Sequence, residues 1–130
     1  MQWNAEVKEL LEKQMWYLAT QGERPNVVPV AFKGISPEGE LLVGDVFLHT
    51  TLENLQKDAN IAVAVSDEQA LKGYQIKGTA RYVSEGPAVE HFRAMVEAMF
   101  HGAATAKGAL VIAPAEVIVT TPGADCGKRL

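Results

Sequence analysis

An alternating segment at residues 71–83 restricts the fold more than any other part of the chain. Successive side chains of a β-strand point to opposite faces, so every second residue belongs to one face. The two sets in this segment are Tyr74, Ile76, Gly78, Ala80 and Tyr82, and Gln75, Lys77, Thr79 and Arg81. The first set suits a packed face and the second suits water or a ligand. The segment therefore predicts one long strand of an antiparallel sheet with a wet face.

Further strand-like and helical patterns flank this segment. Strands are expected at residues 16–21, 26–35, 41–48, 60–66 and 109–121, and helices at residues 4–15, 51–57 and 87–101. Asn4 suits the N-cap of the first helix, and Pro87 suits the first turn of the last one. Strands outnumber helices and do not alternate strictly with them. The pattern predicts a mainly β fold, an antiparallel sheet that closes into a small barrel with peripheral helices.

Three positions predict interruptions in this sheet. Pro29 has no N–H to donate, so it should face an edge, a bulge or a bound molecule, with an edge preferred. Gly44 and Asp45 interrupt residues 41–48 and indicate a bulge or a bend. Pro114 is expected to break the last strand. Corners of this kind are what a barrel needs.

Size, charge and composition exclude several classes of protein. The 130 residues fit one domain, residues 1–130. The net charge is −4 and the basic residues are dispersed, so no nucleic-acid partner is expected. No apolar run approaches the roughly 20 residues that span a bilayer, so no membrane partner is expected either. The charged first turns exclude the apolar core of a signal peptide, which predicts a cytoplasmic location.

Common catalytic and metal-binding motifs are missing from the sequence. There is no Walker loop, no Gly-x-Gly-x-x-Gly opening a helix and no Gly-x-Ser-x-Gly elbow. His49, His91 and His101 do not pair at metal-ligand spacing, and Cys126 is the only cysteine. Spacing alone therefore predicts no metal site and no catalytic acid or base.

Residues 49–55, with the sequence HTTLENL, carry the most functional information. Two hydroxyls and an imidazole stand where a strand gives way to a short helix, whose free amides and dipole favour a phosphate. His49 would add charge or a hydrogen bond there. Thr50-x-x-Glu53 also matches a capping box, which satisfies the same amides without a ligand, and the Glu53 carboxylate would repel a phosphate. Both interpretations stay open at this point.

Four motifs occur in an order that resembles a known family: NVVPV at residues 26–30, TT-x-x-NL at 50–55, KGYQIKGTA at 72–80 and GALVI at 108–112. Together they resemble the pyridoxamine 5′-phosphate oxidase-related FMN-binding split-barrel family, and its short single-domain members most closely. The resemblance implies a six-stranded antiparallel split β-barrel. It also implies a homodimer with two FMN molecules bound in clefts at the subunit interface.

The resemblance assigns three groups of site residues. The FMN phosphate would be held by His49, Thr50, Thr51 and Asn54. The isoalloxazine ring would lie along Val28, Pro29, Val30 and Ala31, and along Val46, Phe47 and Leu48. Gln75 and Lys77 would reach the flavin edge or the phosphate, from the neighbouring subunit in one arrangement.

The chain also departs from its relatives. Many of them place Lys or Arg directly before the threonine of the phosphate loop, where this chain has Thr50, so phosphate binding would be weaker or would rely on Lys77 and the helix N-terminus. The Trp- and Arg-rich C-terminal segment of the true oxidase is missing, so oxidation of pyridoxamine phosphate is not expected.

The function that the resemblance implies is a redox flavoprotein. It would be an FMN-dependent oxidoreductase or an electron carrier that acts with a small-molecule electron donor or acceptor. The alternatives are a non-catalytic protein that binds flavin, haem or a deazaflavin in the same cleft, and a structural dimer whose cleft has lost its ligand.

Overall fold

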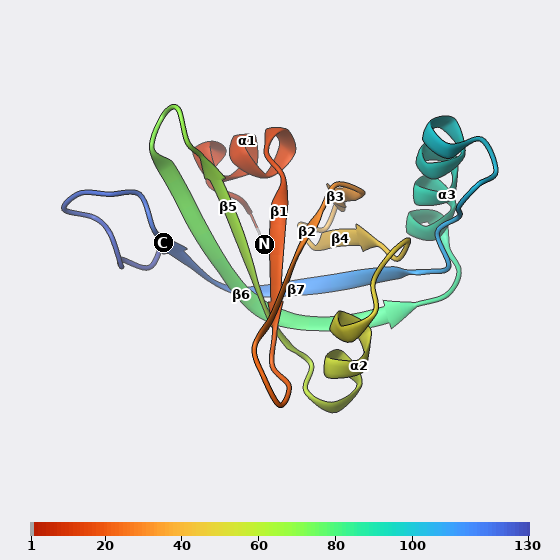
Figure 1. Cartoon of the computed structure of the whole chain (residues 1–130). Coiled ribbons are helices and arrows are strands. Elements are labelled where there is room, and N and C mark those ends of the chain that lie inside the picture. Colours follow the sequence, from red (N-terminus) through yellow and green to blue (C-terminus); the bar gives the residue numbers. More distant parts are fainter. Residues whose placement is uncertain (1) are drawn as a thin grey trace.

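The computed structural model describes residues 2–130, which form three helices and seven strands (Figure 1). The helices are α1 (Ala5–Lys13), α2 (Thr50–Lys57) and α3 (Pro87–Phe100). The strands are β1 (Trp16–Thr20), β2 (Asn26–Val30), β3 (Lys33–Ile35), β4 (Leu41–Gly44), β5 (Asn60–Asp67), β6 (Lys72–Val83) and β7 (Ala109–Val119).

All seven described strands join one antiparallel sheet in the order β2-β1-β5-β6-β7-β4-β3. The two edge strands, β2 and β3, are joined by only Ala31 and Phe32. Three Cα–Cα steps span at most about 11 Å, so the two ends of the sheet come close together. The sheet therefore curls, and Figure 1 shows the long strands β6 and β7 curving through it. This confirms the predicted mainly β fold of the split-barrel type.

The strand count is seven, where the resemblance implied six, because the predicted strand at residues 26–35 is divided. Asn26–Val30 pairs with β1, whereas Lys33–Ile35 pairs with β4 at the other end of the sheet. The chain changes partner at Ala31 and Phe32, so no single strand can continue through them. The predicted strand at residues 41–48 is also too long, since β4 ends at Gly44.

The predicted interruptions have different outcomes. Pro29 lies exposed on the edge strand β2, which confirms the edge interpretation. Pro114 does not break β7, so that prediction was wrong. Lys77 pairs with Glu116 and Gly78 with Pro114, which leaves Ala115 as an extra residue, so a bulge absorbs the proline.

Two clusters of buried side chains hold the structure together. The larger one lies on the inner face of the sheet, where α1 adds Val7, Leu10 and Leu11. At its centre the fully buried Trp16 donates a hydrogen bond from Nε1 to the Leu11 carbonyl oxygen at 2.8 Å. The smaller cluster lies beneath α3 and includes Phe92. The helices α1 and α3 thus each bury one apolar stripe, as amphipathic helices do.

The predicted alternation and the predicted N-cap are both confirmed. In β6 the side chains of Tyr74 and Ile76 are buried, while Lys77 is exposed; the pattern fails at the end of the strand, where Tyr82 is 44% exposed. The Asn4 side chain accepts hydrogen bonds from the first amides of α1. Met15 differs from the expectation, because it lies beyond the end of α1 and is 47% exposed. Among residues 2–130, no helix has both the length and the apolar character needed to cross a bilayer.

Gly78 is required by the bulge in β7. A Cβ atom at this position would collide with the backbone carbonyl of Ala113. We expect Gly78→Ala to lower the free energy of unfolding by about 3 kcal/mol, because a backbone clash cannot be relieved by rotating a side chain. Urea denaturation measures this.

Gly34→Ala is the matched control, since a Cβ at Gly34 meets nothing within 4 Å. Its free energy of unfolding should stay within about 0.5 kcal/mol of the wild-type value. Equal stability of the two variants would contradict the role given to Gly78.

Candidate functional site

The N-terminus of α2 is free of side-chain capping. The helix begins at Thr50, its N-cap is His49, and no side chain bonds the first amides. The N–H groups of Leu52 and Glu53 donate to the His49 carbonyl oxygen at 3.0 and 3.2 Å. The capping-box interpretation of Thr50 and Glu53 is therefore wrong. The side chains of His49 and Thr50 are exposed.

Thr51 and Asn54 have internal partners instead. Thr51 is 1% exposed, and its hydroxyl oxygen accepts a hydrogen bond from Asn26 Nδ2 at 3.0 Å. Asn54 is 9% exposed and donates from Nδ2 to Thr20 Oγ1 at 3.1 Å. Asn26 Nδ2 also lies 3.3 Å from Thr20 Oγ1. This polar network docks α2 against β1 and β2, and so it fixes where the helix N-terminus points.

The seven residues assigned to the ring all line one groove. Its volume is about 230 Å³, and Met15, Phe32 and Gly44 complete the lining. One wall is β2 with the link that follows it, and the other is the segment between β4 and α2. All the lining side chains are apolar, which suits a flat aromatic ring.

The groove leads to the start of α2. Leu48 belongs to the groove lining, and His49 and Thr50 follow it directly in the chain. Since β2 is an edge strand, one side of its backbone has no partner strand. Unpaired N–H and C=O groups on that side can bond the polar edge of a ring. The site thus combines an apolar groove, a free strand edge and a helix N-terminus.

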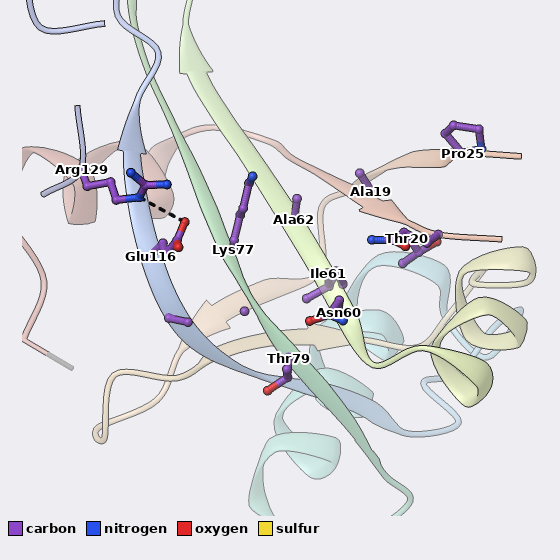
Figure 2. A pocket seen from close by; sticks show the side chains of 13 residues that line it. Ala19, Thr20, Pro25, Asn60, Ile61, Ala62, Lys77, Thr79, Glu116 and Arg129 are labelled. Atoms are coloured by element: carbon purple, nitrogen blue, oxygen red, sulfur yellow. Dashed lines mark ion pairs between the residues drawn. The ribbon is translucent and has the colours of Figure 1, made fainter. Parts of the chain in front are cut away.

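Lys77 lies in a different cavity, of about 580 Å³, on the outer face of the sheet (Figure 2). Figure 2 shows its side chain on β6, with Ala62 and Ala19 on the neighbouring strands and Glu116 and Arg129 on the other side. Arg129 Nε lies 3.6 Å from Glu116 Oε2.

The structure does not bring Lys77 or Gln75 into the groove of the same chain. Lys77 pairs with Ala62, and β1 follows β5 in the sheet, so two strands separate it from β2. At about 4.8 Å between strands, its backbone lies roughly 14 Å from that of β2. Gln75 precedes Lys77 by two residues on β6 and pairs with Ala64 of β5, so it is separated from β2 by the same two strands. Contact with a cofactor in the groove would have to come from a second copy of the chain.

Sequence reasoning assigned no role to Asp45, which lies in the chain between the groove residues Gly44 and Val46. Its side chain is 2% exposed, and its Oδ2 atom accepts a hydrogen bond from the Tyr82 hydroxyl at 2.6 Å. The Gly44-Asp45 interruption in a strand-like run was the available signal, but it showed a bend rather than a buried carboxylate. No group of three or more His, Cys, Asp or Glu side chains within residues 2–130 could hold a metal ion.

Comparisons with known proteins point to one family. The family model described as pyridoxamine 5′-phosphate oxidase matches residues 4–123. A search of curated proteins found no match.

Several solved structures share the fold. HupZ from Group A Streptococcus is similar with a TM-score of 0.81 and 22% identity, over 97% of this chain and 100% of that one. A Clostridium acetobutylicum protein of the pyridoxine phosphate oxidase family, related to general stress protein 26, has a TM-score of 0.73 and 17% identity, over 90% and 87%. An F420 reductase has a TM-score of 0.65 and 16% identity, over 85% and 94%.

The polar network under α2 yields a stability prediction. Thr20→Val removes the hydroxyl that accepts from both Asn26 and Asn54. The side-chain amides of Asn26 and Asn54 would then each lose one hydrogen bond at a site with little access to water. We expect the free energy of unfolding to fall by about 2 kcal/mol. Chemical denaturation followed by circular dichroism measures it.

Thr79→Val is the control, because Thr79 is exposed on β6 and valine suits a strand. Its stability should match or slightly exceed that of the wild type. If Thr20→Val were as stable as Thr79→Val, the network would not hold the helix.

Proposed function

The chain belongs to the pyridoxamine 5′-phosphate oxidase family, and on that basis we propose that it is a homodimeric FMN-binding redox protein acting with a small-molecule electron donor or acceptor. The observation that carries this proposal is the groove beside β2. Its lining includes all seven residues that the family resemblance assigned to the isoalloxazine ring. Residues from three separate parts of the chain form the groove, and we take this as support for a binding site.

The groove suits a flavin ring for two physical reasons. Its apolar side chains would bury the flat faces of the ring, and the burial of apolar surface is favourable. The unpaired edge of β2 would offer backbone hydrogen bonds to the polar pyrimidine end. Together these features would orient the ring and exclude water from it.

The phosphate would lie at the start of α2. The exposed Thr50 hydroxyl and the uncapped amides at the positive end of the helix dipole suit an anion. His49, next to them, would add a further hydrogen bond or a charge. In this proposal Thr51 and Asn54 serve the phosphate indirectly, because their side chains hold the helix in place.

A second copy of the chain would complete the site. The outer face of the sheet carries Tyr17 and Val27, which are 45% and 65% exposed, beside the small side chains of Ala62 and Ala64. A face of small and apolar side chains suits contact with an identical face. Such contact would bring Lys77 and Gln75 of one subunit toward the groove of the other.

The chain's own contribution to chemistry would be binding and orientation. In the described part of the chain, residues 2–130, no titratable side chain lines the groove, so no side chain there can donate or accept a proton. Bound FMN supplies the transfer of electrons or hydride. The similarity to an F420 reductase supports a redox role and makes F420 the second ligand to test.

The phosphate site predicts opposite effects for two substitutions. Thr50→Ala should weaken FMN binding by about 1–2 kcal/mol, because a hydrogen bond to a charged group is lost. Glu53→Gln should strengthen it by about 0.3–1 kcal/mol, because a carboxylate in the first turn repels a phosphate. Quenching of FMN fluorescence gives both dissociation constants.

Thr105→Ala, an exposed threonine after α3, is the control and should bind FMN like the wild type. A wild-type protein that ignores FMN and accepts F420 would move the proposal to that cofactor. A protein that binds neither would contradict it.

The proposed dimer predicts the effect of a charge on the outer face. Ala64→Glu places a carboxylate between Tyr17 and Gln75 in the paired strands, where two copies would face each other. Buried charge without a partner is costly, so we expect a monomer with at least tenfold weaker FMN binding. Sedimentation equilibrium measures the assembly.

Ala98→Glu on the exposed side of α3 is the control and should remain a dimer. A dimer in both variants would place the interface elsewhere.

A further inference from the structure

Asp45 is a buried carboxylate with incomplete hydrogen bonding. It follows β4 and is 2% exposed. Tyr82 supplies one donor, at 2.6 Å from Oδ2. Among residues 2–130, the other oxygen, Oδ1, has no hydrogen-bond partner, and none of the ion pairs includes Asp45. A buried charge of this kind is costly to the fold, so its presence calls for an explanation.

Several contacts hold Asp45 in one position. Its N–H donates to the Gly108 carbonyl oxygen, and its carbonyl oxygen accepts from the Lys107 N–H, both at 2.9 Å. Gly108 packs so closely against the Tyr82 ring that a Cβ there would overlap the hydroxyl. The carboxylate therefore has little freedom to turn toward water.

Tyr82 is held in its protonated form by its surroundings. Burial, together with the hydrogen bond to Asp45 and its charge, raises the pKa of Tyr82 to about 12. The tyrosine thus stays protonated and keeps donating to Asp45 throughout the physiological range.

Asp45 also lies between two residues of the groove. Gly44 before it and Val46 after it both line the groove, whereas Asp45 itself is not one of the lining residues. Among residues 2–130, no cationic side chain lines that groove. The field of the Asp45 carboxylate therefore reaches the proposed ring site without a compensating charge in the lining.

We propose that Asp45 is a tuning residue, a fixed negative charge beside the groove lining that makes the protein bind the reduced cofactor less tightly than the oxidised one. The inference rests on the proposed function. Reduction adds electron density to a flavin ring, and a nearby anion opposes that change. At an effective dielectric constant of about 20, two unit charges separated by roughly 10 Å shift an equilibrium by about tenfold, and we expect an effect of this order from Asp45. The result is a lower reduction potential for the bound cofactor.

Asp45→Asn tests this directly, because it removes the charge and keeps an oxygen that can accept from Tyr82. We expect the ratio of the dissociation constants for oxidised and reduced FMN to rise by about tenfold, which for a two-electron couple raises the potential by about 30 mV. Affinity for oxidised FMN should change by less than about twofold. Redox titration of the protein with FMN bound gives the reduction potential. Fluorescence quenching gives the dissociation constant for oxidised FMN, and the two values together give the constant for reduced FMN.

Asp67→Asn is the matched control, since it removes one charge at the far end of β5, where Asp67 bonds the amides of Gln69 and Ala70. Its potential should equal that of the wild type. Tyr82→Phe keeps the charge and removes its donor, so it should lower stability without raising the potential. If Asp45→Asn does not fold, Asp45→Ser provides the same loss of charge in a smaller side chain.

The outcomes separate the two proposals. A raised potential in the uncharged Asp45 variant, and not in Asp67→Asn, supports the inference. An unchanged potential with FMN still bound overturns it and leaves the proposed function intact. A wild-type protein that binds no FMN overturns the proposed function, and this inference with it.

Discussion

The structure depends on a two-residue link, Ala31 and Phe32, between the strands at opposite ends of the sheet. Because the link is this short, the sheet must curl until the ends of β2 and β3 that it joins lie close together. The curl creates an inner face that buries Trp16 and the apolar stripe of α1. The bulge opposite Gly78 lets the long strands β6 and β7 follow that curvature.

The same link explains why a site exists at this place. Because β2 and β3 meet without pairing, the barrel stays split, and an apolar groove lies beside the unpaired edge of β2. The segment after β4 forms the opposite wall and leads directly into α2. A ring in the groove and an anion at the helix would therefore both contact one continuous stretch of chain, residues 46–50, which Asp45 directly precedes.

Much of this could be predicted from local patterns. The alternation at residues 71–83, the cap at Asn4 and the edge position of Pro29 depend on neighbours in the sequence or on a missing N–H, and all three were predicted. The division of residues 26–35 was not, because it depends on which distant strand each half pairs with. The network of Thr20 and Asn26 with α2, and the hydrogen bond between Tyr82 and Asp45, join residues far apart in the sequence, and such pairs leave no periodic signal. The groove residues were assigned from family resemblance, and physical reasoning alone would have found only that β2 has a free edge.

In the proposed function, the groove beside β2 and the start of α2 together hold one FMN molecule. Hydrogen–deuterium exchange with and without FMN tests this binding most directly. We expect slower exchange at residues 26–32 and 46–54, with α1 and the turn between β5 and β6 unchanged. No change on adding FMN, or protection confined to the cavity between α2 and β6 that Leu52 and Ala80 line, would contradict the account.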